Sequence, residues 1–228
     1  MRDYVANTNA SETDSAYLRR VGLKPNVLEL CGDCSGRRVL DIGAADGWLR
    51  RELPAGTLVE CDIAPPGTRS GSFVVCDAAA LPFAPGSFDV VVSSLVLMWM
   101  PDLDTAYRTA FRITRPGGRL VVALVHPYFY RTGRVTKRHY ALDRDLSTAW
   151  ELDGHTIAGR TGPFRYHYHR YDAYLGNALA AGWKLDMVRD WFIDLADYRA
   201  HVRENLQVIT RSGSIPLYSF LKFTKMGS

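Results

Sequence analysis

The sequence feature that most constrains the fold is an apolar run that enters a glycine-containing turn and leaves it as a helical pattern. Residues 38–42 read Arg-Val-Leu-Asp-Ile, the turn that follows reads Gly-Ala-Ala-Asp-Gly, and residues 48–53 follow as the helix. A strand, a tight turn and a helix in this order open an α/β fold whose ligands bind at the turn. Gly43 permits the tight exit from the strand, and Ala45 and Gly47 let the backbone approach a ligand.

An acidic residue next to this turn narrows the kind of ligand. Asp41 stands two residues before the first glycine, and Gly43 and Gly47 are four residues apart. The dinucleotide pattern G-x-G-x-x-G is therefore absent, so the turn fits NAD poorly. A carboxylate near the turn attracts a cation and free backbone N–H groups bind an anion, which suits a ligand with both an ammonium and a carboxylate. A plain strand-to-helix turn without a ligand is the alternative.

Size and charge limit the remaining possibilities. A chain of 228 residues that is 47% apolar can bury one full core, so we expect a single domain over residues 1–228. The net charge of +4 comes from scattered Lys and Arg, which argues against a nucleic-acid partner. No apolar stretch is long enough for a bilayer, and the N-terminus lacks a signal-peptide core, so we expect a cytoplasmic protein with no membrane partner. The sequence leaves open whether the protein forms a homodimer.

Two more apolar runs end in an acid. Residues 57–61 lead into Asp62 and Ile63, and residues 73–76 lead into Asp77. The carboxyl ends of parallel strands border the crevice where ligands bind, and a carboxylate there can accept both hydroxyls of a ribose. Taken alone, Asp62 could equally cap a turn.

The rest of the chain continues the alternation of strands and helices. The further expected strands cover residues 88–95, 119–125, 184–192 and 215–223, and the expected helices cover residues 16–30, 103–113, 171–181 and 197–208. Pro116-Gly117-Gly118 is expected to end the helix before it, and Pro25 to break the first helical stretch.

Two segments lie outside this alternation. Residues 1–35 are expected to form an N-terminal arm with helices. Residues 127–170 are dense in Tyr, His and Arg, and residues 164–171 alternate with period two, which predicts strands of a small antiparallel cap. Long insertions at the ligand edge commonly cover substrates.

Four cysteines could indicate a metal or redox site. Cys31 and Cys34 form C-x-x-C, but no second pair or H-x-H partner follows, so we expect free thiols and no metal.

The turn and the acids together resemble a known family. The pattern D-x-G-x-A-x-G at residues 41–47 resembles the D/E-x-G-x-G-x-G motif of class I S-adenosylmethionine (SAM) dependent methyltransferases, with Ala45 in place of the middle glycine. The run D-A-x-x-L-P-F at residues 77–83, followed by Ser-Phe-Asp at 87–89, is the more specific match. Within the family, small-molecule enzymes of the methyltransferase-11 and ubiquinone/menaquinone type are the most similar.

The resemblance implies a fold and a reaction. The fold would be a doubly wound α/β fold, a Rossmann-like and mostly parallel sheet of seven strands in the order 3-2-1-4-5-7-6, with the antiparallel cap inserted after strand 5. The cofactor would be SAM and its product S-adenosylhomocysteine. In this family Asp62 would bind the ribose, Asp77 the adenine amino group, and Ile63 the adenine face. The full set of implied cofactor contacts is Asp41, Gly43, Ala45, Gly47, Asp62, Ile63, Asp77, Ala78 and Ser94.

Catalytic residues are less constrained, because methyl transfer needs mainly alignment and removal of a proton. His126, at the end of the predicted strand 119–125, is the first candidate base, and a structural histidine is the alternative. His167 and His169 on the cap are the next candidates. The expected walls of the substrate pocket are Trp99, Tyr128 and Tyr130.

We therefore expect transfer of a methyl group to oxygen or nitrogen of a small molecule in secondary metabolism. The alternatives are a nucleic-acid methyltransferase and a SAM-binding regulator without transfer activity.

Overall fold

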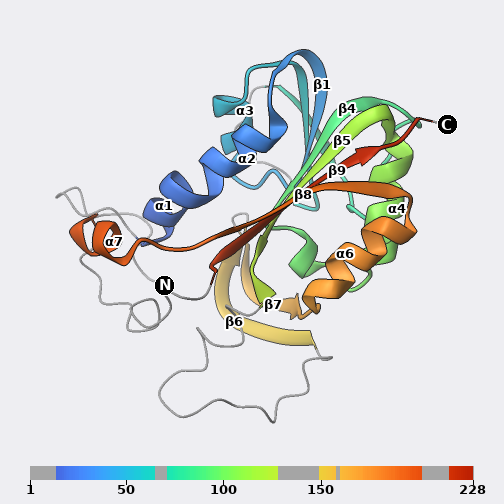
Figure 1. Cartoon of the computed structure of the whole chain (residues 1–228). Coiled ribbons are helices and arrows are strands. Elements are labelled where there is room, and N and C mark those ends of the chain that lie inside the picture. The colour runs from blue at the N-terminus through green and yellow to red at the C-terminus, as the bar shows by residue number, and fades with distance from the viewer. Residues whose placement is uncertain (1–13, 65–70, 128–148, 158–159, 202–215, 228) are drawn as a thin grey trace.

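The computed structural model describes residues 14–64, 71–127, 149–157, 160–201 and 216–227 (Figure 1). Its strands form one large sheet and one hairpin. The strands of the large sheet are β1 (Cys34–Ile42), β2 (Ala55–Asp62), β3 (Ser72–Val75), β4 (Phe88–Ser94), β5 (Thr114–Val125), β8 (Trp183–Trp191) and β9 (Tyr218–Lys225).

The order of these strands is β3-β2-β1-β4-β5-β9-β8. Counted within the large sheet, β8 and β9 are the sixth and seventh strands, so the order is 3-2-1-4-5-7-6 and the predicted fold class is confirmed. Pairing is parallel from β3 through β5, and β9 runs antiparallel to both β5 and β8. The carboxyl ends of β1 to β5 therefore lie at one edge of the sheet, which we call the carboxyl edge.

Helices cover both faces of the sheet because parallel strands need crossover connections. In Figure 1, α1, α2 and α3 lie on one side of the sheet, and α4 and α6 lie on the other. The helices are α1 (Asp14–Leu18), a π-helical segment (Arg19–Leu23), α2 (Lys24–Cys31), α3 (Trp48–Glu52), α4 (Leu103–Ile113), α6 (Tyr171–Ala180) and α7 (Leu195–His201). Within the described residues, no helix has the length and apolar character needed to cross a bilayer.

Each face of the sheet carries its own hydrophobic core. Along β1, Val39 packs into the core under α2, whereas Leu40 and Ile42 pack into the core under α4 and α6. This division follows from the alternation of side chains along a strand. Both cores are formed by side chains that are almost fully buried, so the sheet is a rigid platform for the loops at its carboxyl edge.

The helix α4 shows why a helix could be predicted from the pattern of apolar residues. The Asp102 side chain accepts a hydrogen bond from the Thr105 backbone N–H at 3.2 Å and caps the helix. The buried face consists of Leu103, Ala106, Tyr107, Ala110 and Ile113. These positions recur with the helical period that predicted the element.

Two predicted boundaries differ from the structure. Pro116-Gly117-Gly118 lies inside β5, at a register shift against β4, so the strand begins at Thr114 rather than Arg119. Pro25 does not break the N-terminal helical stretch, because it occupies the first turn of α2, where its missing N–H is not needed.

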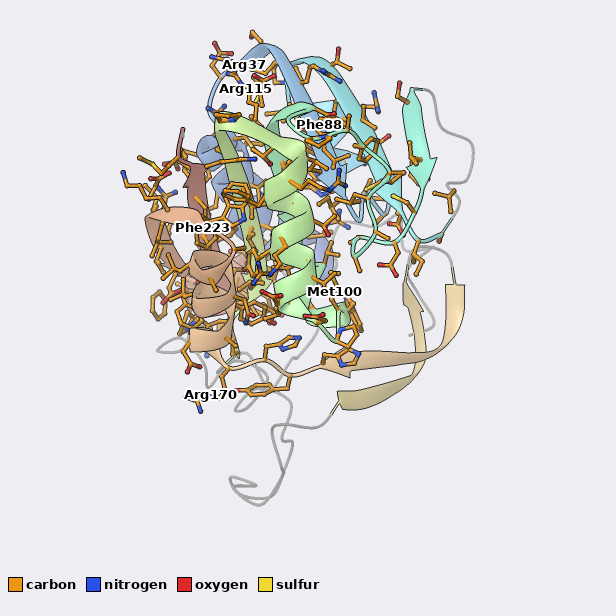
Figure 2. The ribbon with its side chains drawn as sticks, turned by 90° about the vertical axis from the view of Figure 1, so that its right-hand side faces the viewer. Arg37, Phe88, Met100, Arg115, Arg170 and Phe223 are labelled. Atoms are coloured by element: carbon orange, nitrogen blue, oxygen red, sulfur yellow. The ribbon has the colours of Figure 1, made fainter. Side chains whose placement is uncertain are left out.

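The predicted cap is present as a hairpin. β6 (Ala149–Ile157) and β7 (Arg160–His167) pair antiparallel between β5 and α6 in the sequence. In Figure 1 the hairpin lies below the large sheet, at its carboxyl edge. Figure 2 shows Met100 and Arg170 toward this end of the molecule and Arg37 and Arg115 at the opposite end.

The C-terminal boundaries shift slightly. The helix α7 begins at Leu195, two residues before the predicted start, and ends at His201; residues 202–208 of the predicted helix lie outside the described residues. The last strand begins at Tyr218 rather than at 215.

Candidate functional site

The glycine-containing turn after β1 is held against the end of β2. The backbone N–H groups of Gly43 and Ala44 both donate to the Cys61 carbonyl, at 2.8 and 3.0 Å. The Ala45 N–H donates to Asp62 Oδ2 at 3.0 Å. Three consecutive backbone N–H groups of the turn are thus bonded within the protein and are not available to a ligand anion.

Strained backbone conformations occur in this turn and directly after the neighbouring strand β4. Among the described residues, the two non-glycine residues with positive φ are Ala45 (43°) and Leu95 (60°). Ala45 lies in the turn after β1, and Leu95 directly follows β4, the neighbouring strand. Such residues cost energy and concentrate at ligand sites.

The turn after β1 and the segment after β4 are also in contact. A Cβ atom on Gly43, whose φ is +69°, would lie 2.3 Å from Val96 Cγ2. This distance is far shorter than a carbon–carbon contact of about 3.5 to 4 Å. Glycine is therefore required at position 43 both for its φ and for the close approach of the loop after β4.

The three predicted acids lie at the ends of three adjacent strands. Asp41 is the penultimate residue of β1 and is buried, with 2% of its surface exposed. Asp62 is the last residue of β2, and its other carboxylate oxygen accepts from the Ala64 N–H at 3.1 Å. Asp77 follows β3 by two residues and accepts from the Ala79 N–H at 2.8 Å. The Cys76 N–H donates to the Asp62 carbonyl at 3.0 Å, so the loop that carries Asp77 lies beside Asp62.

Two further observations fit a bound adenosyl group at this edge. The Ile63 side chain, the expected contact of the adenine face, is 64% exposed beside Asp62. Exposure of a large apolar side chain next to convergent polar groups is typical of a ligand surface. At the end of β4, the Ser94 hydroxyl is buried and has no hydrogen-bond partner among the described residues. The residues present therefore fit SAM: acids for the ribose and adenine, an apolar surface for the ring, and a buried hydroxyl beside the turn.

A small cavity lies under this surface, between the sheet and α4. Its volume is about 10 Å³, and Ile42, Ala78 and Leu97 contribute to its lining. This volume admits one water molecule at most. An adenosine would accordingly rest on the exposed Ile63 surface and not inside this cavity. The hydroxyls of Ser93 and Tyr107, which also line the cavity, have no hydrogen-bond partner among the described residues.

His126 directly follows β5 at the carboxyl edge, as the sequence predicted. Its imidazole is almost fully buried and stacks on the Tyr171 ring, with centroids 5.0 Å apart. The Nε2 atom lies 3.8 Å from Asp190 Oδ2. Burial lowers the pKa of His126 below its usual range, and the Asp190 carboxylate opposes that shift in part. The imidazole is therefore neutral at neutral pH, which is the form that can accept a proton.

His167 and His169, the two histidines predicted on the cap, lie next to one another at the end of β7. Their rings stack with centroids 6.4 Å apart. The His169 Nε2 atom lies at hydrogen-bonding distance, 2.8 Å, from the Met100 carbonyl, and burial lowers the pKa of His169. The cap is thereby tied to the segment that follows β4.

Of the predicted pocket walls, one is described. The Trp99 indole N–H donates to the Leu95 carbonyl at 3.1 Å, and the ring packs on a small cluster around Met98 and Tyr168. This segment is the short 3-10 helix Leu97–Trp99. Tyr128 and Tyr130 lie outside the described residues.

Sequence reasoning missed the partners of these residues. Asp190 of β8 and Tyr171 of α6 lie against His126, and Ser219 of β9 is hydrogen-bonded to Tyr171. No local sequence pattern connects these residues. Arg19, in the π-helical segment, binds both carboxylate oxygens of Asp46 in the turn after β1, at 3.1 Å each. The sequence pattern does not distinguish this π-helical segment from an ordinary helix.

The strand order and the layered fold are those of the class I SAM-dependent methyltransferases. Residues 40–122 match the family described as methyltransferase domain. Over these residues the chain is similar to this family. That match runs from the last three residues of β1 to residue 122 in β5, and so it includes every predicted cofactor residue.

Two curated relatives share this region. The chain is 38% identical over 105 residues to a demethylmenaquinone methyltransferase from Beutenbergia cavernae, covering 42% of this chain and 44% of the relative. It is 36% identical over 105 residues to a malonyl-[acyl-carrier protein] O-methyltransferase from Halorhodospira halophila, covering 40% of this chain and 36% of the relative. The chain thus spans less than half the length of these curated relatives.

A solved structure extends the likeness to most of the fold. A SAM-dependent methyltransferase from Mesorhizobium loti superposes with a TM-score of 0.67 at 20% sequence identity, covering 88% of this chain and 96% of that one. At this identity the likeness shows the fold alone.

Proposed function

We propose that this protein transfers the methyl group of SAM to an oxygen or nitrogen atom of a small molecule in natural-product biosynthesis. The observation that carries the proposal is the alignment of Asp41, Asp62 and Asp77 at the ends of three adjacent strands, beside a strained turn. Asp62 would bind the ribose hydroxyls and Asp77 the adenine amino group. When bound, SAM supplies a methyl group on a positively charged sulfur, which is a good leaving group.

The chain's own residues would then orient and enclose the acceptor. Methyl transfer requires that the nucleophile, the methyl carbon and the sulfur be aligned and shielded from water. The hairpin β6–β7 is joined to the end of β4 through His169 and the Met100 carbonyl, so it is suited to cover an acceptor bound at the carboxyl edge. Neutral His126 at the end of β5 is the proposed proton acceptor for a hydroxyl substrate.

Two observations support a small acceptor over a nucleic acid. One relative is named for demethylmenaquinone and the other for malonyl-[acyl-carrier protein], and neither name refers to a nucleic acid. The basic residues of this chain are scattered and many are paired with acids, for example Arg115 with Asp89 and Arg189 with Glu29. A phosphate-binding surface would instead cluster unpaired basic residues.

Incubation with methyl-labelled SAM tests this proposal. The purified protein is given either a small-molecule extract or total RNA, and the label is followed by chromatography. We expect label in small molecules and none in RNA. Label in RNA, or SAM that binds without any transfer, would contradict the proposal, because a fold alone does not determine the reaction.

A further inference from the structure

The strand order indicates which way the cofactor would lie along the carboxyl edge. Asp77 and Asp62, the proposed partners of the adenine and the ribose, lie at the ends of β3 and β2, and β1 is the next strand in the sheet. The cofactor would therefore extend from β3 toward β1. Its methionine part, which carries an ammonium and a carboxylate, would lie at the turn after β1.

The backbone of this turn has few donors left for a carboxylate. Three of its N–H groups are bonded to the end of β2. The Gly47 N–H donates to the Ala44 carbonyl at 2.7 Å, and the Trp48 N–H donates to Asp46 Oδ1 at 3.3 Å. The helix α3 that begins there has five residues, so few peptide dipoles add up at its N-terminus. A carboxylate at this turn therefore needs a cationic side chain.

Arg19 brings a guanidinium group to the turn from a distant part of the chain. It lies in the π-helical segment, and its Nη2 atom is 3.1 Å from each carboxylate oxygen of Asp46. The other N–H groups of this guanidinium have no partner among the described residues. Because the Arg19 side chain is 25% exposed, a ligand can reach these groups.

Arg19 and Asp62 also belong to the same side of the sheet. Leu58 of β2 packs into the core under α2, and Asp62 is four residues further along this strand. Side chains alternate along a strand, so Asp62 shares the face of Leu58. Leu18, the residue before Arg19, packs into this same core, and α1, α2 and α3 lie together on this side in Figure 1.

The balance of charge at the turn favours an anion. The Asp46 carboxylate has a second guanidinium neighbour, Arg51, whose Nη2 atom lies 3.8 Å from Asp46 Oδ2 and whose Nη1 group donates to the Asp46 carbonyl at 2.7 Å. Two cations and one carboxylate leave a net positive charge at the turn. The Arg51 side chain is 59% exposed, so its charge is screened by solvent more than that of Arg19.

We propose that Arg19 binds the carboxylate of the methionine part of SAM through the guanidinium N–H groups that Asp46 does not use, and that Asp46 positions this guanidinium. Charge-assisted hydrogen bonds between a guanidinium and a carboxylate are among the strong ones in proteins. Arg19 is thus a cofactor-binding residue outside the segment that matches the methyltransferase family. This inference rests on the proposed function, because it requires SAM as the cofactor.

Two cofactors that differ only in this carboxylate test the inference by binding, without the need for turnover. SAM and decarboxylated SAM share the adenosine, the sulfonium and the amino group. Each is titrated by calorimetry into the full-length protein. We expect SAM to bind at least tenfold more tightly than decarboxylated SAM.

The variants locate the effect. Arg19→Gln should weaken SAM binding at least tenfold, leave the affinity for decarboxylated SAM within twofold and remove the preference between the two cofactors. Arg19→Lys keeps the charge and should restore part of the preference. The control is Arg20→Gln, the same change at the next residue, whose guanidinium lies over the Tyr17 ring. It should leave both affinities within twofold.

Three results would overturn the inference: equal affinities of the wild-type protein for SAM and decarboxylated SAM, equal weakening of both by Arg19→Gln, or a preference that survives Arg19→Gln and disappears in Arg51→Gln. Equal weakening would mean that Arg19 only supports the turn through Asp46. Failure of both cofactors to bind the wild-type protein would instead contradict the proposed function, so the wild-type titrations distinguish the two failures.

Discussion

The close approach of Gly43 to Val96 makes a sharp test of how the cofactor turn is built. Gly43→Ala adds one Cβ atom, which would lie 2.3 Å from Val96 Cγ2, 3.3 Å from its Cγ1 and 3.4 Å from its Cβ. The β-branched valine strongly prefers one χ1 rotamer, so rotation of its side chain relieves this clash only at a further cost. Without that rotation, the turn after β1 or the segment after β4 must move.

The cost can be estimated from two separate effects. A left-handed φ costs a non-glycine residue about 1 to 2 kcal/mol. Forcing an extra carbon into a packed contact costs about 1 to 3 kcal/mol. We expect Gly43→Ala to lower the free energy of unfolding by about 2 to 5 kcal/mol in total.

A matched control isolates the second effect. Gly36 has φ +71°, and a Cβ there would meet nothing within 4 Å. Gly36→Ala should therefore lower the free energy of unfolding only through the left-handed φ, by about 1 to 2 kcal/mol. In urea unfolding followed by circular dichroism, Val96→Ala should recover most of the difference in the Gly43→Ala background. Equal destabilisation by Gly43→Ala and Gly36→Ala, or no coupling to Val96, would refute the reasoning.

Two more predictions concern the same edge of the sheet. Ala45→Gly should raise the free energy of unfolding by about 1 kcal/mol, because Ala45 has φ 43°, and a lower melting temperature would contradict this. His126 and His169 both have a pKa lowered by burial from the usual value of 6.5, so the unfolded chain binds protons more readily than the folded one. The free energy of unfolding should therefore be constant with respect to these groups above about pH 7.5 and fall as the pH drops below about 6.5. Urea unfolding at a series of pH values below about 6.5 should show a smaller dependence of the free energy of unfolding on pH for His169→Gln than for the wild-type protein. An unchanged dependence would count against the burial of that ring.

The strand order could be predicted because each strand carries a local signal. β1, β2, β4 and β5 are apolar runs bounded by turn residues, and their acids and motifs indicate which edge they share. The resemblance to the family supplied the antiparallel last strands, which periodicity alone would not have ordered. Boundaries were less predictable, since a Pro-Gly-Gly sequence ends a helix and also permits the irregular start of β5.

The sequence predicted that the three acids lie at the ends of strands, but it did not predict their hydrogen bonds. The Asp62 carboxylate binds the Ala45 N–H, and the Cys61 carbonyl binds the two N–H groups before it. These contacts join segments far apart in the sequence, so no pattern of spacing reveals them. The same holds for Asp190, which reads as an ordinary charged residue on an edge strand until β9 and α6 are placed around it.

The central claim is that the acids at the carboxyl ends of β1, β2 and β3 hold the adenosyl cofactor. The most direct measurement is a calorimetric titration of SAM into the wild-type protein, Asp62→Ala and Asp89→Ala. Asp89 is the control, because it pairs with Arg37 and Arg115 at the opposite end of the molecule (Figure 2). We predict that Asp62→Ala weakens SAM binding by about 1.5 to 3 kcal/mol while Asp89→Ala leaves it unchanged. Equal affinities for Asp62→Ala and the wild-type protein would contradict the claim.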